Sequence, residues 1–506
     1  MMSNPVVHIH NLNLKYQQQP VLQDLCWTIN RNDNWLLCGE SGSGKTTLAK
    51  VIAGLIPSLE GDIQLNFDLS SALPAKAYYV ANWYQFKDLE GASNFYYQQR
   101  YQSLATAITA TVIAELTRFG NDQGLSFETL EQLLTALGFA ALKNSALLQL
   151  SSGEHKKLQL VKAVWSKPQL LILDQPYNGL DKLSRANLND LLTELSESGT
   201  QLIIIGNETE LPATINRFAV LEAGKLKEIS SPPSLREEAE EIIKPLPSFL
   251  QKEKVSDSTS ISTSIFGSSP SSTTTEHIIK MIDVNIRYGD KQVLKNINWE
   301  VKTGEKWILQ GHNGSGKSTL LSLISGDHPQ AYANNFYLFG NKRGTGESIW
   351  EIKERIGIIS PELHWYFDAS ATVWQSIASG FYDSSGLYCS PGSTKHSQVD
   401  ELVEYFGLTA YKNTLMNELP LGKQRLTLLA RTIVKKPAIL ILDEPCQGLD
   451  QQQTQHFNKL VDELCKDGTT LVYVGHFESQ LPSCIEKRIL LEDGAVKSVE
   501  NLLQSI

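Results

Sequence analysis

The sequence has no apolar run of the roughly 20 residues that a membrane-spanning helix requires. Its first ten residues also lack the basic region followed by an apolar stretch that is typical of a secretory signal. These absences argue against a membrane-spanning or secreted chain. We therefore expect a cytoplasmic protein, whose only association with the membrane would be peripheral, at its inner face.

Cysteine is scarce and scattered. None of the six cysteines has a neighbour at metal-ligand or redox spacing, and the ten histidines are also dispersed. This pattern favours reduced thiols in a cytosolic protein. The formal net charge of −10 argues against a general nucleic-acid binder, whose surface is usually basic, although a local basic patch is compatible with it. The cysteines are Cys26, Cys38, Cys389, Cys446, Cys465 and Cys484.

What the sequence does contain is a long internal repeat. Residues 39–46 read GESGSGKT and residues 311–318 read GHNGSGKS, and both match the phosphate-loop pattern GxxxxGK[ST]. Each loop follows a short apolar run and precedes a helical pattern, which is the strand–loop–helix context that this motif needs. The residues expected to bind nucleotide phosphates are Gly39, Gly42, Gly44, Lys45, Thr46 and Thr47 in the first copy, and Gly311, Gly314, Gly316, Lys317, Ser318 and Thr319 in the second.

Further landmarks recur at matching distances. In both copies a tyrosine precedes the loop lysine by 29 residues, and an apolar run ends in an aspartate. A leucine lies 24 residues before that aspartate, and a polar residue lies 33 residues after it. Coincidence does not explain so many equal spacings, so the chain repeats itself. In chain order the landmarks are Tyr16, Leu150, Asp174 and Asn207, then Tyr288, Leu419, Asp443 and His476.

Between the copies lies a stretch with little apolar surface. In residues 256–275, fourteen of twenty side chains are Ser or Thr and none is Lys or Arg. Such a segment cannot offset the entropy of ordering itself, which predicts a flexible tether. We predict domains at residues 5–230 and 278–506, joined by a linker at 231–277 that is first charged and then Ser/Thr-rich. Alternating strand and helix patterns predict an α/β fold with a largely parallel sheet in each domain.

The phosphate loop binds anions because its backbone N–H groups surround phosphate oxygens at a helix N-terminus. The two loop lysines would reach the β- and γ-phosphates. Mg²⁺ would be held by hydroxyl and carboxylate oxygens. An aspartate at a strand end is often only a turn former or helix cap, but the proline two residues later and the repeated spacing favour the metal role. The predicted metal ligands are Thr46 and Asp174 in the first copy, and Ser318 and Asp443 in the second.

Together these features resemble the ABC ATPase family over nearly all of both halves. The family signature LSGGQ is matched by LSSGE at residues 150–154 and, in degraded form, by LPLGK at residues 419–423. The resemblance implies ATP hydrolysis with Mg²⁺ as cofactor, with Tyr16 and Tyr288 stacking on adenine. It also implies that each parallel core carries an antiparallel subdomain and a helical subdomain.

In this family two cassettes close head to tail, so that each ATP lies between the phosphate loop of one and the signature of the other. The resemblance therefore pairs the second phosphate loop with Ser151 and Gly153. It pairs the first loop with Pro420, where the family has a serine. The linker is long enough for an intramolecular cassette dimer, but two chains closing reciprocally would satisfy the same pairing.

The copies differ at the residues that the family uses for hydrolysis. After the strand-end aspartate the family has a glutamate that activates water, and further on a histidine that contacts the γ-phosphate. The second copy has Glu444 and His476 at these positions, whereas the first has Gln175 and Asn207. With the proline in the second signature, all the departures fall in one composite site. The pattern favours one hydrolytic site and one holding site.

The family's Mg²⁺-contacting loop glutamine is missing from its usual place in both copies. The second copy has Pro361 and then Glu362 where it is expected. In the first copy Gln85, a few residues later than usual, is the candidate metal contact. Glu362 would replace the glutamine in the second copy, and either residue could instead be an ordinary loop residue.

Two aromatic stretches look like those of the ModF-type subgroup, whose members are named putative molybdate-transport ATP-binding proteins or photorepair proteins. They are residues 95–101 (FYYQQRY) and 379–388 (SGFYDSSGLY). The name implies the ATP-binding subunit of a transporter with a separate membrane permease, but no residue outside the nucleotide sites points to molybdate. The stretches are a candidate docking surface or simply local core. The alternative is a soluble ABC ATPase with a regulatory, DNA-associated or translation-associated role.

Overall fold

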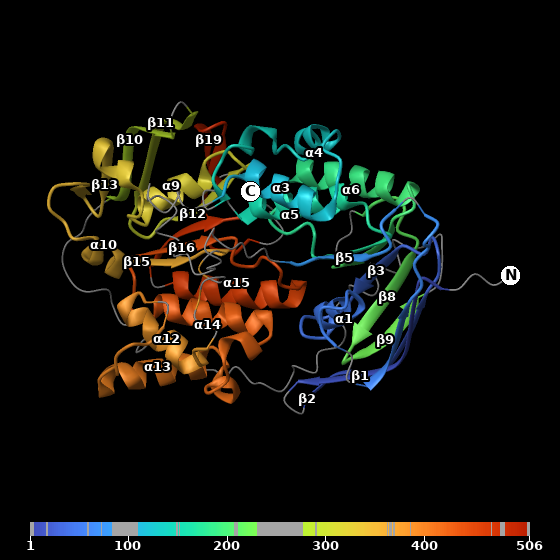
Figure 1. Cartoon of the computed structure of the whole chain (residues 1–506). Coiled ribbons are helices and arrows are strands. Elements are labelled where there is room, and N and C mark those ends of the chain that lie inside the picture. The colour runs from blue at the N-terminus through green and yellow to red at the C-terminus, as the bar shows by residue number, and fades with distance from the viewer. Residues whose placement is uncertain are drawn as a thin grey trace. The chain divides into compact units, whose positions relative to one another are not determined.

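The computed structural model describes residues 5–16, 19–57, 60–71, 73–82, 110–147, 150, 152–206, 211–229, 277–288, 291–361, 363, 367, 370–384, 386–466, 468–475 and 481–502. The chain divides into two compact units (Figure 1). We call them unit 1, whose described part lies within residues 5–229, and unit 2, whose described part lies within residues 277–502.

Unit 1 is built on a six-stranded sheet with the strand order β5-β6-β7-β3-β8-β9. Neighbouring strands are parallel except β8 and β9, which form an antiparallel hairpin. Strands β6 (LLILD) and β7 (QLIII) are buried along their whole length, as expected for parallel strands covered on both faces. The strands are β3 (Trp35–Cys38), β5 (Ala77–Val80), β6 (Leu170–Asp174), β7 (Gln201–Ile205), β8 (Arg217–Glu222) and β9 (Lys225–Ile229).

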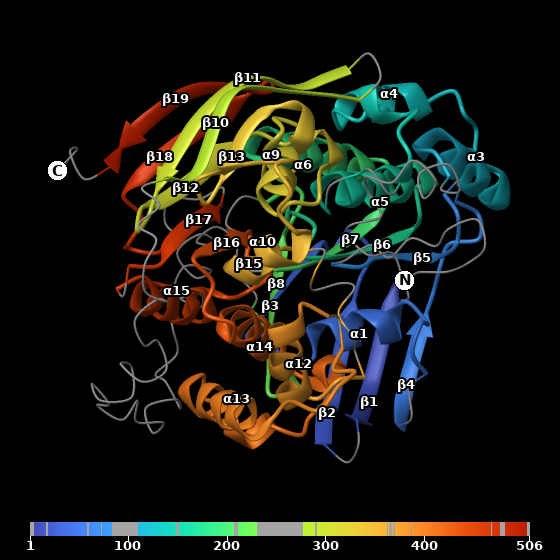
Figure 2. The same ribbon diagram turned by 90° about the vertical axis from the view of Figure 1, so that its left-hand side faces the viewer.

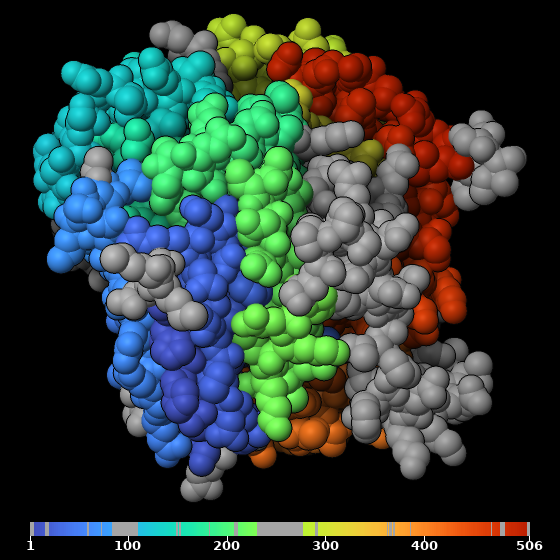
Figure 3. Space-filling model, turned by 90° about the vertical axis from the view of Figure 1, so that its right-hand side faces the viewer, coloured from blue at the N-terminus to red at the C-terminus, as the bar shows by residue number. Residues whose placement is uncertain are grey.

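A three-stranded antiparallel sheet, in the order β2-β1-β4, completes the β-structure of unit 1. Figure 3 shows this sheet (blue) and the β8–β9 hairpin (green) as one continuous face. The two are joined where the backbone N–H of Gln23 donates to the carbonyl oxygen of Gly224 at 3.0 Å. The strands and the helices of this unit are β1 (Val7–Tyr16), β2 (Gln19–Ile29), β4 (Glu60–Leu65), α1 (Lys45–Ile52), α3 (Val112–Gln123), α4 (Leu130–Ala136), α5 (Ser152–Ser166) and α6 (Lys182–Glu197).

Unit 2 repeats this plan, with sheets in the orders β15-β16-β17-β12-β18-β19 and β11-β10-β13-β14. Figure 2 shows β10, β11 and β13 beside β18 and β19. The strands are β10 (His277–Tyr288), β11 (Lys291–Lys302), β12 (Lys306–Gly311), β13 (Asn335–Leu338), β14 (Asn341–Lys342), β15 (Ile356–Ile359), β16 (Ile439–Asp443), β17 (Thr470–Val474), β18 (Lys487–Glu492) and β19 (Ala495–Asn501). The helices are α9 (Lys317–Ile324), α10 (Ile349–Arg355), α12 (Val373–Ser379), α13 (Ser393–Tyr405), α14 (Leu421–Ile433) and α15 (Gln451–Cys465).

The predicted α/β fold class is confirmed in both units. Each has a largely parallel core, an antiparallel sheet, and helices inserted between the sheet's edge strand and the strand that ends in aspartate. In unit 2 the helices α12, α13 and α14 bury one apolar cluster with β16 and β17. Burial of this cluster ties the inserted helices to the strand that carries Asp443.

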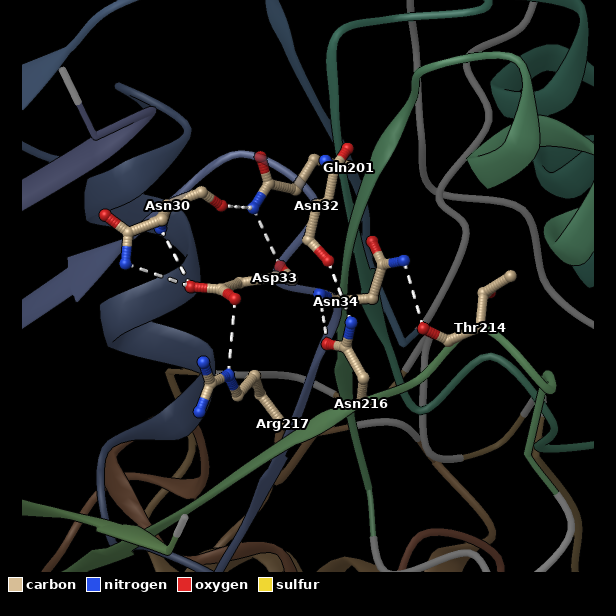
Figure 4. Close-up of polar contacts among 8 residues, drawn as sticks. All are labelled: Asn30, Asn32, Asp33, Asn34, Gln201, Thr214, Asn216 and Arg217. Carbon is tan, nitrogen blue, oxygen red and sulfur yellow. Dashed lines mark hydrogen bonds and ion pairs between the residues drawn. The ribbon is translucent and has the colours of Figure 1, made fainter. Parts of the chain in front are cut away.

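A polar network closes the edge of the unit 1 sheet where β3, β7 and β8 begin (Figure 4). Asp33 accepts hydrogen bonds from the backbone N–H of Asn30 at 3.1 Å and from Arg217 Nε at 3.2 Å. Gln201 Nε2 donates to the carbonyl oxygens of Asn30 and Asp33 at 2.6 and 2.7 Å. The residues at the starts of these strands are therefore hydrogen-bonded to one another. A ligand site is expected at the opposite ends of the strands, where their carboxyl ends lie.

Candidate functional site

Both phosphate loops lie at the carboxyl ends of a central strand, after β3 in unit 1 and β12 in unit 2. Their first glycine has no room for a side chain, because a Cβ on Gly39 would lie 2.4 Å from a backbone oxygen of β8, and one on Gly311 2.5 Å from a backbone oxygen of β18. The glycine before each lysine has φ near 103° or 102° and begins the next helix. The loops therefore have the shape that presents helix N-terminal N–H groups to an anion.

The loop lysines are held in the same way in both units. Lys45 Nζ donates to the carbonyl oxygens of the first two loop residues at 2.8 and 2.6 Å. Lys317 Nζ makes the equivalent hydrogen bonds at 2.7 and 3.0 Å. Each ammonium group thus lies across its own loop, where phosphate oxygens would be bound. The predicted middle glycines of the loops, Gly42 and Gly314, have φ of 86° and 84°, and the predicted Thr47 and Thr319 lie in the first turns of α1 and α9.

In unit 1 the two predicted metal ligands lie together. Thr46 Oγ1 donates to Asp174 Oδ2 at 2.7 Å, and Asp174 is 2% exposed at the end of β6. The hydroxyl of Tyr79 on β5 donates to the same oxygen at 3.0 Å. Burial and the neighbouring Asp174 charge raise the pKa of Tyr79, so its hydroxyl stays protonated as a donor. Hydroxyl and carboxylate oxygens are the donors that Mg²⁺ prefers, and the set therefore fits this ion.

The residue after each strand-end aspartate has an unusual backbone. Gln175 and Glu444 both have φ of 45°, in the left-handed region that such residues rarely adopt. Both donate their backbone N–H to the last residue of the neighbouring strand, at 2.8 Å to Ile205 and 3.1 Å to Val474. The two units therefore present this side chain at the same φ, and the side chain ends in an amide in unit 1 and in a carboxylate in unit 2.

Around Gln175 the structure shows a closed triangle of amides. Asn82 Nδ2 and Asn178 Nδ2 each donate to Gln175 Oε1 at 2.7 Å. Asn178 Nδ2 also donates to Asn82 Oδ1 at 2.9 Å. We call these three residues the amide triangle. It joins the end of β5 to the turn between β6 and α6.

A buried cation supports the same strand ends from the signature helix. Lys156 on α5 donates to the carbonyl oxygens of Ala81 at 2.9 Å, Asp174 at 3.2 Å and Asn82 at 3.4 Å. Burial lowers the pKa of Lys156 to about 7, and the Asp174 charge opposes that shift. Lys156 follows the first signature leucine by six residues, and Arg425 follows the second by six. Each is the fifth residue of its helix, α5 or α14.

The signature segments begin helices in both units. Gly153 is buried near the start of α5, and α14 begins after Pro420, which has φ of −57°. A Cβ on Gly422 would lie 2.9 Å from the side chain of Gln453, so this position has little room. Pro420 supplies no side-chain hydrogen bond to the helix N-terminus. The second signature thus keeps the helix geometry without the serine hydroxyl.

The predicted adenine-stacking tyrosine of unit 2 has a histidine partner. His328 Nε2 lies 2.7 Å from the Tyr288 hydroxyl, and His328 Nδ1 accepts from the backbone N–H of Gln330 at 3.2 Å. Because Nδ1 accepts, Nε2 carries the proton and donates to the tyrosine oxygen. Burial lowers the pKa of His328 to about 4, which keeps the ring neutral at physiological pH. The Tyr288 ring is 37% exposed, so part of it faces solvent.

Some predicted residues lie outside the described part of the chain. They are the side chain of Tyr16 and the residues Gln85, residues 95–101, Ser151, Asn207, Glu362 and His476. Conversely, sequence reasoning missed residues that the structure places at the site. These are Tyr79, Asn82, Lys156, Asn178 and His328.

Within the described residues no helix is long and apolar enough to cross a membrane. The same residues hold no group of three or more His, Cys, Asp or Glu side chains placed to bind a metal ion.

Comparison with known proteins identifies the fold and the family. The sequence profile described as "ABC transporter" matches residues 22–178 and 294–447. The ABC transporter ATP-binding protein ModF of Escherichia coli is 34% identical over 478 residues, which cover 93% of each chain. An uncharacterized ABC transporter ATP-binding protein of Schizosaccharomyces pombe is 29% identical, over 94% of this chain and 95% of its own. Among solved structures, an archaeal ribosome recycling factor (aABCE1, in complex with the stalk protein aP1) matches with a TM-score of 0.52 and 17% identity, over 98% of this chain and 90% of that one, which is similarity of fold alone.

Proposed function

Because the chain belongs to the ABC transporter family of ATP-binding proteins, we propose that its two cassettes have unequal roles in ATP hydrolysis. Unit 2 supplies the hydrolytic residues, and unit 1 binds ATP and retains it. In the hydrolytic site Glu444 accepts a proton from the attacking water while Lys317 stabilises the charge that develops on the γ-phosphate. Mg²⁺, held by Ser318 and Asp443, would neutralise the phosphate oxygens.

The observation that carries this proposal is the shared backbone at the position after the aspartate. Gln175 and Glu444 have the same φ and the same backbone hydrogen bond. The lower activity that we propose for unit 1 thus comes from the side chain rather than from a distorted loop. An amide cannot accept a proton as a carboxylate does, and losing a general base costs about 10²–10⁴ in rate, or roughly 3–5 kcal/mol of barrier.

The family's head-to-tail pairing extends the proposal to composite sites. It assigns Ser151 and Gly153 to the ATP bound by the second phosphate loop. It assigns the second signature, with Pro420, to the ATP bound by the first. The glutamine, the asparagine and the proline that depart from the family pattern then act on the same nucleotide, and that nucleotide is the one retained.

The membrane partner is the second part of the proposal. The ModF relative is named an ABC transporter ATP-binding protein, and the described residues of this chain include no helix that could span a membrane. We infer that the chain energises a separate permease at the inner face of the membrane. The nucleotide-binding residues do not identify the transported solute, and molybdate is suggested only by the name of the subgroup.

The division of roles is tested with two glutamine variants. Steady-state ATPase assays and equilibrium ATP binding would compare Glu444→Gln with Gln175→Ala. We expect Glu444→Gln to lower turnover about 10²–10⁴-fold without loss of ATP binding. Gln175→Ala should change turnover by less than about threefold, because it removes no base. Turnover that persists in Glu444→Gln, or a larger loss in Gln175→Ala, would overturn the assignment.

The partner is tested in the same background. Glu444→Gln protein loaded with ATP would be incubated with membranes and crosslinked, with the ATP-free protein as control. The expected result is an ATP-dependent crosslink to a polytopic membrane protein that also stimulates the ATPase of the unmutated chain when both are reconstituted. If all of the protein were recovered in the supernatant and no membrane protein stimulated its ATPase activity, the alternative of a soluble ABC ATPase without a permease would be favoured.

A further inference from the structure

Resting on the proposed retention of ATP by unit 1, we propose that the amide triangle is a dedicated lock that keeps position 175 from activating water. Asn82 and Asn178 are its positioning residues. Removal of the carboxylate is then only part of the reason why this site does not hydrolyse ATP.

The first step is the capacity of one oxygen. An amide oxygen has two lone pairs, and Gln175 Oε1 accepts one hydrogen bond from each asparagine at 2.7 Å. A glutamine is not inert by nature at such a site, because some nucleotide hydrolases use one to orient the attacking water. Here the oxygen that would orient that water is already saturated. What remains of the side chain is its NH₂ group, which can only donate, as a phosphate oxygen requires.

The second step is rigidity. The triangle closes on itself through the 2.9 Å hydrogen bond from Asn178 to Asn82. The Asn82 backbone is held by Lys156 Nζ, which also binds the carbonyl oxygen of Asp174 at 3.2 Å. Three elements thus fix the geometry of Gln175, so reorientation of its amide would break several hydrogen bonds together.

The third step is the contrast with unit 2. The strand register shows which positions of the two units correspond. Val80 pairs with Leu173 in unit 1, and Ile359 pairs with Leu442 in unit 2, so Val80 and Ile359 are equivalent. Two residues beyond Val80 is Asn82, and two beyond Ile359 is Pro361, which has no side-chain donor. The counterpart of Asn178, three residues after position 175, is Gln447. Unit 2 therefore has one amide side chain at these two positions, where unit 1 has two asparagines.

The lock makes a specific prediction for a restored carboxylate. In Gln175→Glu the new carboxylate would accept two amide hydrogen bonds, which occupy one of its oxygens and fix its orientation. The single substitution should therefore recover little hydrolysis. Removing the two donors as well should free that oxygen to accept a hydrogen bond from the attacking water.

The experiment uses the full chain in the Glu444→Gln background, so that turnover from unit 2 is silenced. Single-turnover ATP hydrolysis would be compared between Gln175→Glu and Gln175→Glu with Asn82→Ala and Asn178→Ala. We expect the unlocked protein to be at least about tenfold faster. Gln175→Leu with the same two alanines is the matched control and should show no gain, because leucine has no acceptor. Equal rates in the locked and unlocked carboxylate proteins would overturn the lock.

A second measurement decides the case in which neither protein hydrolyses ATP. Crystal structures of the Gln175→Glu protein with and without the two alanine substitutions would show how the carboxylate at position 175 is oriented. A carboxylate held by both asparagines in the first protein and turned away in the second supports the proposal, and the same orientation in both refutes it. The proposed function fails in a separate way, because hydrolysis would then persist in the Glu444→Gln background before any lock residue is changed.

Discussion

Position 175 in unit 1 and position 444 in unit 2 are occupied by different side chains on the same backbone. Both have φ of 45° and both donate to the last residue of the neighbouring strand. The surroundings differ, because Gln175 accepts from two asparagines that have no counterpart pair in unit 2. The comparison teaches that the fold keeps the strained position in both copies, while the side chain at that position and its amide neighbours are free to differ.

The opposite edge of the sheets shows that a difference in residues is not in itself a difference in role. In unit 1 Asp33 is paired with Arg217 at 3.2 Å, supported by amides. In unit 2 the edge is closed by Glu305 with Lys487 at 2.5 Å and by Lys306 with Glu486 at 3.4 Å. Both arrangements hold the strand starts together, so different charged and amide residues can serve the same structural role there. At positions 175 and 444 such an exchange would matter, because the proposed role of that side chain is to accept a proton.

The largest expected effect comes from the loop lysines. Lys317→Ala should lower turnover about 10³-fold, because it removes the charge that stabilises the transferring phosphoryl group. Lys45→Ala should leave turnover within about tenfold and speed the release of retained ATP. ATPase assays and filter-binding release kinetics would measure the two effects. If Lys45→Ala lowers turnover as much as Lys317→Ala does, the two units contribute equally to hydrolysis and the proposed division of roles is wrong.

The lock can be transplanted to sharpen the comparison. Pro361→Asn combined with Gln447→Asn should lower turnover about 10- to 100-fold, because the asparagine pair would occupy a carboxylate oxygen of Glu444 that the attacking water needs. The matched control is Pro361→Ala with Gln447→Ala, which removes the same native side chains and adds no donor. If the control loses as much activity as the asparagine protein, then loss of the native side chains explains the effect and the transplant argument fails.

Much of the fold and the loops could be predicted from the sequence, whereas the lock could not. The glycine loops and the buried strands such as LLILD have short-range signals, and the hydrogen bonds of Lys45 and Lys317 to their own loops agree with the motif. The amide triangle joins residues 96 positions apart, Asn82 and Asn178, which meet only because β5 and β6 are parallel neighbours. No spacing pattern reports such a contact. A residue-by-residue alignment of the two copies would have flagged Asn82 opposite Pro361.

A smaller effect is expected from Tyr79. The Tyr79 hydroxyl donates a hydrogen bond to Asp174 Oδ2 at 3.0 Å. The strand register places Ile358, which has no hydroxyl, at the matching position of unit 2. Tyr79→Phe should raise the affinity of the ATP-bound first site for Mn²⁺, used as a probe for Mg²⁺, about threefold to tenfold, because the carboxylate regains an acceptor. Electron paramagnetic resonance titration in an Asp443→Ala background would measure it.

The control for that titration is Tyr78→Phe. Tyr78 is the neighbouring strand residue, its ring packs edge-on against Phe119, and it is not among the hydrogen-bond partners of Asp174. It should leave Mn²⁺ affinity unchanged. Equal affinities in all three proteins would show that the Tyr79 hydroxyl does not compete with the metal, and that the two units do not differ in this respect.

The smallest catalytic effect is expected at the adenine position. His328→Ile introduces the residue that unit 1 has at the matching position, Ile56, which also follows its loop lysine by 11 residues. Tyr288 would lose the hydrogen bond that orients its ring, so KM for ATP should rise about threefold with kcat unchanged. Tyr288→Phe should have the same effect, and the double variant should add nothing to it. Additive effects would mean that His328 does not act through Tyr288.

The same variant has a pH signature. Burial lowers the pKa of His328 to about 4 from an ordinary value of 6.5, so the unfolded chain binds more protons than the folded one between these values. The neutral ring therefore costs no stability above about pH 6.5, and stability falls as the pH drops from there towards 4. His328→Ile removes this group, so urea unfolding should show a smaller loss of stability across that window than in the unmutated protein. An unchanged pH dependence would show that protonation of His328 is not coupled to folding, and that the Tyr288–His328 contact does not depend on a neutral ring.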